Sequence, residues 1–207
     1  MNEITPDQHS TAYVVDDDES IRTLWRWLME SNGIPVKTFA TASEFIESYR
    51  NGSAGCLVLD LRLPGMSGLE LQEYLNGKGI EIPIVFVTGH GDVPAAVSAL
   101  KGGAVDFIQK PFSHREVLSI IQKAFQRDAE NREQRARRSR TADRLAGLTE
   151  REREVLQRIL EGKPNKVIAS ELDISVKTVE FHRAKVMEKT GVDSVAALVH
   201  IAMQQSK

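Results

Sequence analysis

The feature that most constrains the fold is an alternation, over residues 12–125, of short apolar segments with longer segments of helical periodicity. Such repetition is typical of a mainly parallel sheet that carries helices on both faces. The expected strands are Ala12–Val15, Pro35–Phe39, Cys56–Leu59, Ile84–Val87 and Asp106–Ile108. The expected helices are about Ser20–Asn32, Ser43–Tyr49, Ser67–Lys78, Val93–Lys101 and a last one from His114 onward. Five such units predict a small, doubly wound α/β fold with a five-stranded parallel sheet.

Residues 126–147 form a charged linker in which arginines are interleaved with acidic residues. The segment has neither Pro nor Gly before Gly147, and good helix formers occupy it throughout. We therefore expect the preceding helix to continue well into the linker. A solvated spacer and a direct contact with a nucleic-acid backbone or a second copy of the chain both remain open.

Residues 148–207 are helical throughout by pattern. Thr149 and Glu152 make a capping box for a helix that stops at Gly162. A second helix, Asn165–Leu172, has Pro164 at its start, and a third runs from Val176 to about Thr190. Ser194 caps a fourth helix that reaches Gln204. These four helices predict a small all-α domain with the helix, tight break and helix of a helix-turn-helix.

Composition and charge limit the class of protein. The longest apolar runs, Cys56–Leu59 and Ile82–Val87, are far shorter than the roughly 18 residues of a membrane span, so we expect a cytoplasmic protein. The single cysteine, Cys56, has apolar neighbours and is expected to be buried without a chemical role. Residues 1–125 carry 10 Lys and Arg against 16 Asp and Glu, whereas residues 126–207 carry 17 against 13. A division of this kind is typical of a chain in which the basic half binds a polyanion.

Carboxylates gather where two predicted strands end. Asp16, Asp17 and Asp18 follow the first strand, and Asp60 follows the third. The carboxyl ends of parallel strands meet at one edge of the sheet, and crowded carboxylates repel each other unless a cation joins them. Hard oxygen ligands favour Mg²⁺, or Mn²⁺ in its place. An ordinary turn and helix cap would also account for the three consecutive aspartates.

Two further residues extend this cluster. Thr88 ends the fourth predicted strand, and Lys110 ends the fifth. A hydroxyl, an ammonium, a divalent cation and a carboxylate nucleophile together suit in-line phosphoryl transfer, which depends mostly on positioning and charge neutralisation. Asp60 is therefore the expected acceptor of the phosphoryl group.

The sequence around these residues resembles the receiver domain of two-component response regulators. The resemblance covers about residues 10–125 and rests on four motifs, Val14–Asp18, Leu59–Gly68, Val87–Asp92 and Gly103–Phe112. It implies a flavodoxin-like fold, phosphorylation of Asp60 by a cognate sensor histidine kinase, a cis peptide before Pro111 and Asp18 outside the metal shell. The metal ligands that it implies are Asp16, Asp17, Asp60 and the Arg62 carbonyl, and its switch residues are Thr88, Phe107 and Lys110. Phe107 can equally be a plain core residue.

The resemblance also implies a homodimer of the phosphorylated form. The expected dimer face is the surface of Val93–Lys101 together with Asp106. An element with two stable conformations, placed between the phosphorylation site and the dimer face, would convert the added charge into a change of shape at the dimer face.

The third helix of the C-terminal segment is amphipathic and basic. Its expected inward set is Val176, Val179, Val186 and Thr190. Among the outward residues, Lys177, Arg183 and Lys185 can contact phosphates or guanines, Thr178 a phosphate and Glu180 a cytosine amino group. A solvated helix face would look similar.

The motifs Leu148–Leu156, Gly162–Ala169 and Ser175–Arg183 resemble the LuxR-type DNA-binding domain, and with the receiver the chain resembles the NarL/FixJ class. The resemblance places Asn165, Lys166, Lys177, Thr178, His182 and Lys185 at or near double-stranded DNA, although His182 can instead pack internally. Glu180 departs from members with lysine there, so their base preference does not transfer. The expected domains are a receiver over 1–125, the linker over 126–147 and a DNA-binding domain over 148–207.

The expected function is control of transcription by a phosphorylated regulator that is not an enzyme and that works with RNA polymerase. One rival is a regulator whose output half binds protein or RNA, which salt-dependent, sequence-selective duplex binding would exclude. The other is a metal-dependent phosphatase, which steady turnover of a phosphomonoester would reveal.

Overall fold

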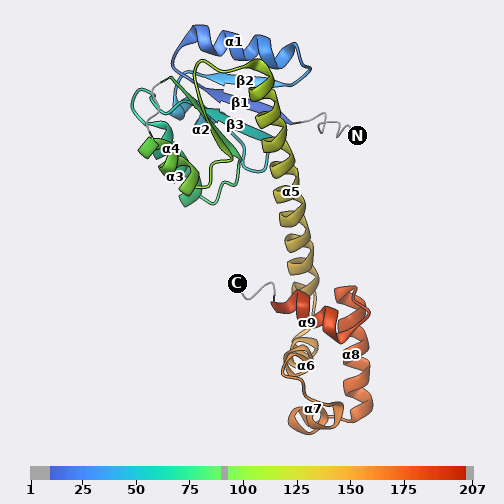
Figure 1. The fold of residues 1–207 in the computed structure, drawn as a ribbon. Coiled ribbons are helices and arrows are strands. Elements are labelled where there is room, and N and C mark those ends of the chain that lie inside the picture. The colour runs from blue at the N-terminus through green and yellow to red at the C-terminus, as the bar shows by residue number, and fades with distance from the viewer. Residues whose placement is uncertain (1–9, 90–92, 204–207) are drawn as a thin grey trace. The chain divides into compact units, whose positions relative to one another are not determined.

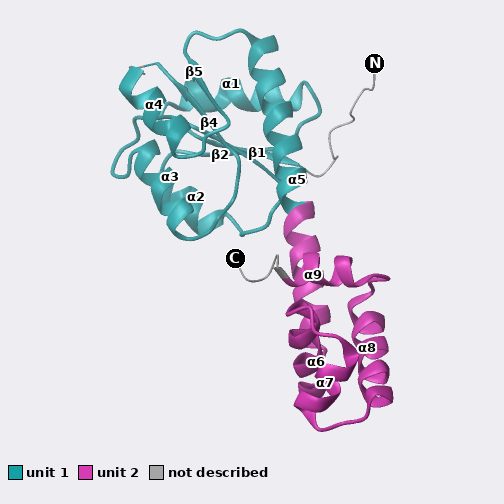
Figure 2. Cartoon of the chain, turned by 60° about the horizontal axis from the view of Figure 1, so that its bottom comes forward, with its two compact units in different colours: residues 1–132 teal, residues 133–207 magenta. Residues whose placement is uncertain are grey.

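The computed structural model describes residues 10–89 and 93–203, without the side chain of Met203. The chain divides into two compact units, residues 1–132 and 133–207, shown in different colours in Figure 2. Residues 90–92, which belong to one of the receiver motifs, and Gln204, the expected end of the last helix, lie outside the described residues.

The first unit is built on a parallel sheet whose strand order is β2-β1-β3-β4-β5. Figure 1 shows β2, β1 and β3 side by side in this sheet. Its strands are β1 (Thr11–Val15), β2 (Val36–Phe39), β3 (Gly55–Leu59), β4 (Ile84–Thr88) and β5 (Asp106–Gln109). Strand β1 pairs with β2 on one side and β3 on the other, so the order reverses at β1 and β3. The predicted doubly wound sheet is confirmed.

Helices cover both faces of this sheet and enclose two separate apolar layers. The helices are α1 (Glu19–Glu30), α2 (Ala42–Ser48), α3 (Gly68–Gly77), α4 (Val93–Lys101) and α5 (His114–Ala146). Trp25 of α1 and Ile121 of α5 pack with Val14, Cys56 and Val58 on one face. On the other face, side chains of α2, α3 and α4 pack with the alternate residues of the same strands. Strand residues that are buried on both faces explain the continuous apolar runs of the sequence.

Helix α5 continues through the arginine-rich segment to Ala146, as its helix formers predict. Asp128, which lies within the predicted linker, is buried at 2% exposure in the first unit. Its carboxylate accepts hydrogen bonds from the Gly55 backbone N–H at 3.0 Å and from Arg132 Nε at 2.7 Å. The start of the linker sequence therefore packs on the first unit.

The second unit contains α6 (Glu150–Leu160), α7 (Asn165–Leu172), α8 (Val176–Thr190) and α9 (Val195–Met203) around one apolar core. The capping box of Thr149 and Glu152 is present at the start of α6. Pro164 is the N-cap of α7, one position before the first turn. Val176 was predicted to face inward but is 37% exposed, because it is the first residue of α8 and lies at the end of the core.

Candidate functional site

The carboxylates of Asp16, Asp17 and Asp60 come together at the carboxyl edge of the sheet. Asp16 and Asp17 directly follow β1, and Asp60 directly follows β3, its neighbour in the sheet. One ligand atom from each residue lies within 4.8 Å of those of the other two. Asp16 is buried, Asp60 is half-buried and Asp17 is exposed, so the cluster is open on one side. Three hard oxygen donors at this spacing fit Mg²⁺, which retains several waters and uses few protein ligands.

Lys110 joins this cluster from the end of β5. Its Nζ lies 2.6 Å from Asp16 Oδ2 and 3.1 Å from Asp60 Oδ2. Burial lowers the pKa of Lys110, but the hydrogen bond and charge of Asp16, together with Asp60, outweigh burial and raise it. Burial raises the pKa of Asp16 against the opposing effect of Lys110. The ammonium thus stays charged and lies directly against the predicted acceptor.

The backbone around Asp60 is closely packed. The Asp60 N–H donates to the Val15 carbonyl at 3.0 Å, and the Arg62 N–H donates to Asp60 Oδ1 at 3.2 Å. Gly68, at the start of α3, leaves no room for a side chain, because a Cβ there would lie 2.2 Å from the Asp60 carbonyl oxygen. The position of Asp60 is therefore set by contacts on both sides of it.

Thr88 and Phe107 lie on the two neighbouring strands. Thr88, the last residue of β4, is buried, and its carbonyl accepts the Lys110 N–H at 2.8 Å. The Lys110–Pro111 peptide is cis, as the resemblance to receiver domains implies. Phe107 of β5 is half-buried, and its ring centroid lies 6.3 Å from that of Phe86. The structure thus brings Thr88 and Lys110 to the same edge of the sheet as the carboxylates.

Asp18 has a different role from its two neighbours. Its side chain is the N-cap of α1 and accepts the Ser20 N–H at 2.8 Å. This hydrogen bond lowers the pKa of Asp18. Asp18 is absent from the carboxylate cluster formed by the described residues, which agrees with the prediction that it lies outside a metal shell.

Sequence reasoning missed Arg22. Its guanidinium donates hydrogen bonds of 2.8 Å to the carbonyl oxygens of both Asp16 and Asp17. Arg22 lies in the first turn of α1, where an arginine side chain usually extends into solvent. Neither helical periodicity nor charge pattern indicates that this one turns back toward the loop.

The helix-turn-helix residues lie on α7 and α8 in the second unit. Lys166, Lys177 and Glu180 are exposed, whereas the other predicted DNA contacts are half-buried, namely Asn165, Thr178, His182, Arg183 and Lys185. Lys185 forms an ion pair with Glu188 at 2.7 Å. The His182 ring lies edge-on to Phe181, 5.6 Å between centroids. Phe181, which was not among the predicted contacts, is 59% exposed and forms an apolar part of this face.

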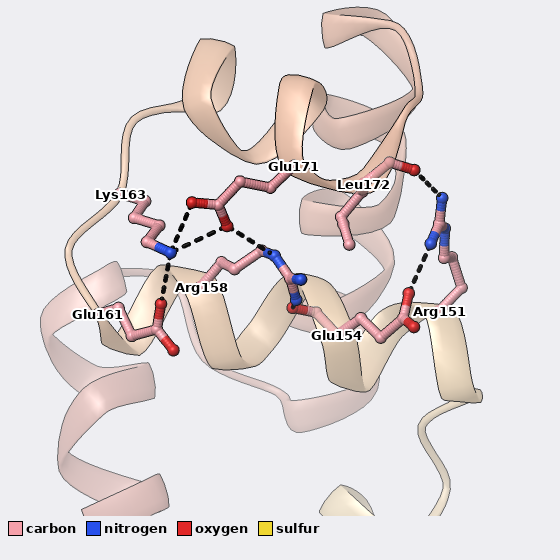
Figure 3. Close-up of polar contacts among 7 residues, drawn as sticks. All are labelled: Arg151, Glu154, Arg158, Glu161, Lys163, Glu171 and Leu172. Atoms are coloured by element: carbon pink, nitrogen blue, oxygen red, sulfur yellow. Dashed lines mark hydrogen bonds and ion pairs between the residues drawn. The ribbon is translucent and has the colours of Figure 1, made fainter.

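A network of charged side chains holds α7 against α6 (Figure 3). Arg158 Nε and Lys163 Nζ bind the Glu171 carboxylate at 3.0 and 2.7 Å, and Lys163 also pairs with Glu161. Arg151 donates to Glu154 and, at 2.6 Å, to the Leu172 carbonyl at the end of α7. Networks hold a geometry better than isolated surface pairs. The network therefore links α7 to α6 at several points, in addition to their shared apolar core.

Comparison with known families agrees with this division into an acidic α/β unit and a helical unit. Residues 12–122 match the response regulator receiver domain, and residues 146–202 match the luxR family of bacterial regulatory proteins. The chain therefore belongs to the two-component response regulators of the NarL/FixJ class, which control transcription. These two domains imply a sensor kinase and DNA as partners. Among the described residues, every helix falls short of the combined length and hydropathy that a membrane span requires.

Individual relatives match over nearly the whole length. The chain is 42% identical to the transcriptional regulatory protein FixJ of Azorhizobium caulinodans over 93% of this chain and 91% of that protein. It is 42% identical to the response regulator TodT of Pseudomonas putida over 94% of this chain and 86% of that one. Among solved structures, the response regulator StyR matches with a TM-score of 0.84 and 46% identity, covering 95% of this chain and 99% of StyR. Full-length FixJ from B. japonicum matches with a TM-score of 0.57 and 38% identity, covering 94% and 96%.

Proposed function

We propose that Asp60 accepts a phosphoryl group from the phosphohistidine of a sensor kinase. The observation that carries the proposal is the contact of Lys110 Nζ with Asp60 Oδ2 at 3.1 Å, beside the cluster of three carboxylates. An Asp60 oxygen forms a bond to phosphorus while the bond from phosphorus to the histidine nitrogen breaks. The Lys110 ammonium stabilises the negative charge on the transferred oxygens, as positioned cations do in phosphoryl transfer.

Mg²⁺, or Mn²⁺, is the proposed cofactor. Asp16, Asp17, Asp60 and the Arg62 carbonyl would hold it. When bound, the ion neutralises the carboxylates and the phosphoryl oxygens. Asp16 has a second function, because its carboxylate orients the Lys110 ammonium at 2.6 Å.

Phosphorylation adds about −1.5 to −2 units of charge at Asp60. In our proposal the Thr88 hydroxyl and the Lys110 ammonium bind the new oxygens, and Phe107 moves into the space behind Thr88. The surface of α4, with Asp106, then pairs with the same surface of a second copy to form a homodimer. Exposed Val93, Val97 and Leu100 give that surface an apolar character that suits a conditional contact.

The proposed output is sequence-specific binding of duplex DNA by α7 and α8, in cooperation with RNA polymerase. Lys166 and Lys177 are exposed and suit phosphate contacts, whereas Glu180 suits a base edge. The remaining proposed contacts are Asn165, Thr178, His182, Arg183 and Lys185. The predicted domain limits, 1–125, 126–147 and 148–207, and the cytoplasmic location belong to the same proposal.

The test compares the full chain with Asp60→Asn, a substitution of nearly equal size. Each protein is incubated with Mg²⁺ and acetyl phosphate, and its molar mass and its binding to random-sequence duplex DNA and RNA pools are measured. Only the wild type should incorporate phosphate, dimerise and select duplex sequences more tightly. Phosphate incorporation in Asp60→Asn would contradict the acceptor assignment. Selection from the RNA pool alone would contradict the DNA assignment.

A further inference from the structure

The bonds of Arg22 suggest a role beyond helix stability. One nitrogen, Nη1, donates to the carbonyl oxygens of Asp16 and Asp17 at 2.8 Å each. These two residues follow the end of β1 and precede α1, so they belong to no regular element. Arg22 itself is anchored in α1, where its N–H donates to the carbonyl of the N-cap residue Asp18 at 3.0 Å. A side chain fixed on a helix therefore holds the backbone of the loop that carries two of the three clustered carboxylates.

The bonds of Arg22 go to backbone oxygens and leave the carboxylates available. This distinguishes Arg22 from Lys110, whose ammonium contacts the carboxylates of Asp16 and Asp60 directly. Lys110 thus bonds to carboxylate oxygens of two proposed metal ligands, whereas Arg22 bonds to backbone oxygens in this loop. A charge-assisted bond to each carbonyl also restricts the backbone torsions that aim the exposed Asp17 side chain.

We infer that Arg22 is a positioning residue for the divalent cation. Arg22 holds the Asp16–Asp17 backbone in the conformation that lets both carboxylates bind the cation. The inference rests on the proposed metal site. Partners that orient metal ligands typically contribute 10–100-fold in affinity, roughly. Loss of both carbonyl bonds should therefore weaken Mg²⁺ binding about tenfold.

The test is a Mg²⁺ titration of the unphosphorylated full chain by calorimetry. Arg22→Met removes both hydrogen bonds, and Arg22→Lys retains the positive charge. Arg26→Met is the matched control, because Arg26 lies one turn further along α1 and its bond at 3.2 Å goes to Thr38 Oγ1 on β2 and not to the carbonyls of the loop. Arg22→Met should raise the dissociation constant about tenfold, Arg22→Lys less, and Arg26→Met less than about twofold.

A second measurement separates positioning from a general loss of structure. The rate of phosphorylation by acetyl phosphate in Arg22→Met should be low at limiting Mg²⁺ and return close to the wild-type rate at saturating Mg²⁺. An unchanged dissociation constant in both Arg22 variants, with wild-type binding intact, overturns the inference alone. If the wild type itself binds no Mg²⁺, or if Asp16→Asn binds as tightly as the wild type, the proposed metal site fails as well.

Discussion

The buried carboxylate of Asp128 offers the sharpest test of how α5 is attached to the first unit. Asp128 is 2% exposed and lies 73 residues along the chain from Gly55, whose N–H it accepts at 3.0 Å. It also pairs with Arg132 at 2.7 Å. The perturbations are Asp128→Ala, which removes both bonds, and Asp128→Asn, which keeps an oxygen for Gly55 but loses the charge.

The expected magnitudes follow from what each variant leaves behind. In Asp128→Ala the buried Gly55 N–H loses its acceptor, which costs about 1–3 kcal/mol. The lost pair with Arg132 adds less than the 3–5 kcal/mol or so of a fully buried pair, because the Arg132 side chain is 29% exposed and water can solvate it. We expect a total loss of about 3 kcal/mol for Asp128→Ala and about 1 kcal/mol for Asp128→Asn.

Tryptophan fluorescence reports this unit selectively, because both tryptophans of the chain, Trp25 and Trp27, lie in it. With a urea dependence of about 1–3 kcal/mol/M, the Asp128→Ala midpoint should fall by roughly 1–3 M. Glu130→Ala is the matched control, since it removes the same charge type from an exposed position of α5 and should change stability by less than about 0.5 kcal/mol. Equal midpoints for Asp128→Ala and Glu130→Ala would refute the reasoning.

Two further predictions concern Glu152 and Gly68. The hydrogen bond from Lys189 lowers the pKa of Glu152, so its stabilisation is full at pH values above the ordinary 4.5 and is lost as pH falls through the lowered pKa. Glu152→Gln keeps the capping box and should lower the free energy of unfolding of the second unit by about 1 kcal/mol at pH 7 and by nothing near pH 2. Hydrogen exchange of α6 and α8 measures this difference, and a difference that does not change with pH would contradict the prediction. Gly68→Ala should destabilise the first unit by about 1–3 kcal/mol and slow phosphorylation by acetyl phosphate, because its Cβ would displace the Asp60 carbonyl. A wild-type phosphorylation rate together with a wild-type melting temperature in Gly68→Ala would contradict this prediction.

Local signals predicted the elements of the fold well. The predicted helix Asn165–Leu172 matches α7, and Thr149 makes with Glu152 the capping box that their spacing indicates. These features depend on residues within one turn of each other, so sequence order carries them directly. The convergence of Asp16, Asp60 and Lys110 was predictable for another reason, because a parallel sheet brings all strand ends to the same side.

Contacts between distant residues were not predictable in the same way. Asp128 resembles its charged neighbours on α5, and only its position opposite Gly55 makes it a buried partner of the sheet. Arg22 turns back to the loop before α1 because the carbonyl oxygens of Asp16 and Asp17 lie within its reach, and a charge pattern does not show where backbone carbonyls lie. Val176 follows the inward periodicity of α8, yet it lies beyond the core that would have buried it. In each of these positions tertiary geometry determined the environment, and local pattern did not.

The positions of these contacts also bear on which part of the first unit can respond to phosphorylation. Strand β3 begins at Gly55, which binds Asp128, and ends next to Asp60; it is buried throughout and paired on both sides, so it is stiff. Strand β5 lies at the sheet edge, pairs only with β4 among the described strands, and carries the half-buried Phe107. Packed cores do not deform continuously, so a change at Asp60 must be absorbed where packing is loosest. We therefore expect the proposed switch through Thr88 and Phe107 to move β5 and α4, and we expect β3 and Asp128 to keep α5 attached.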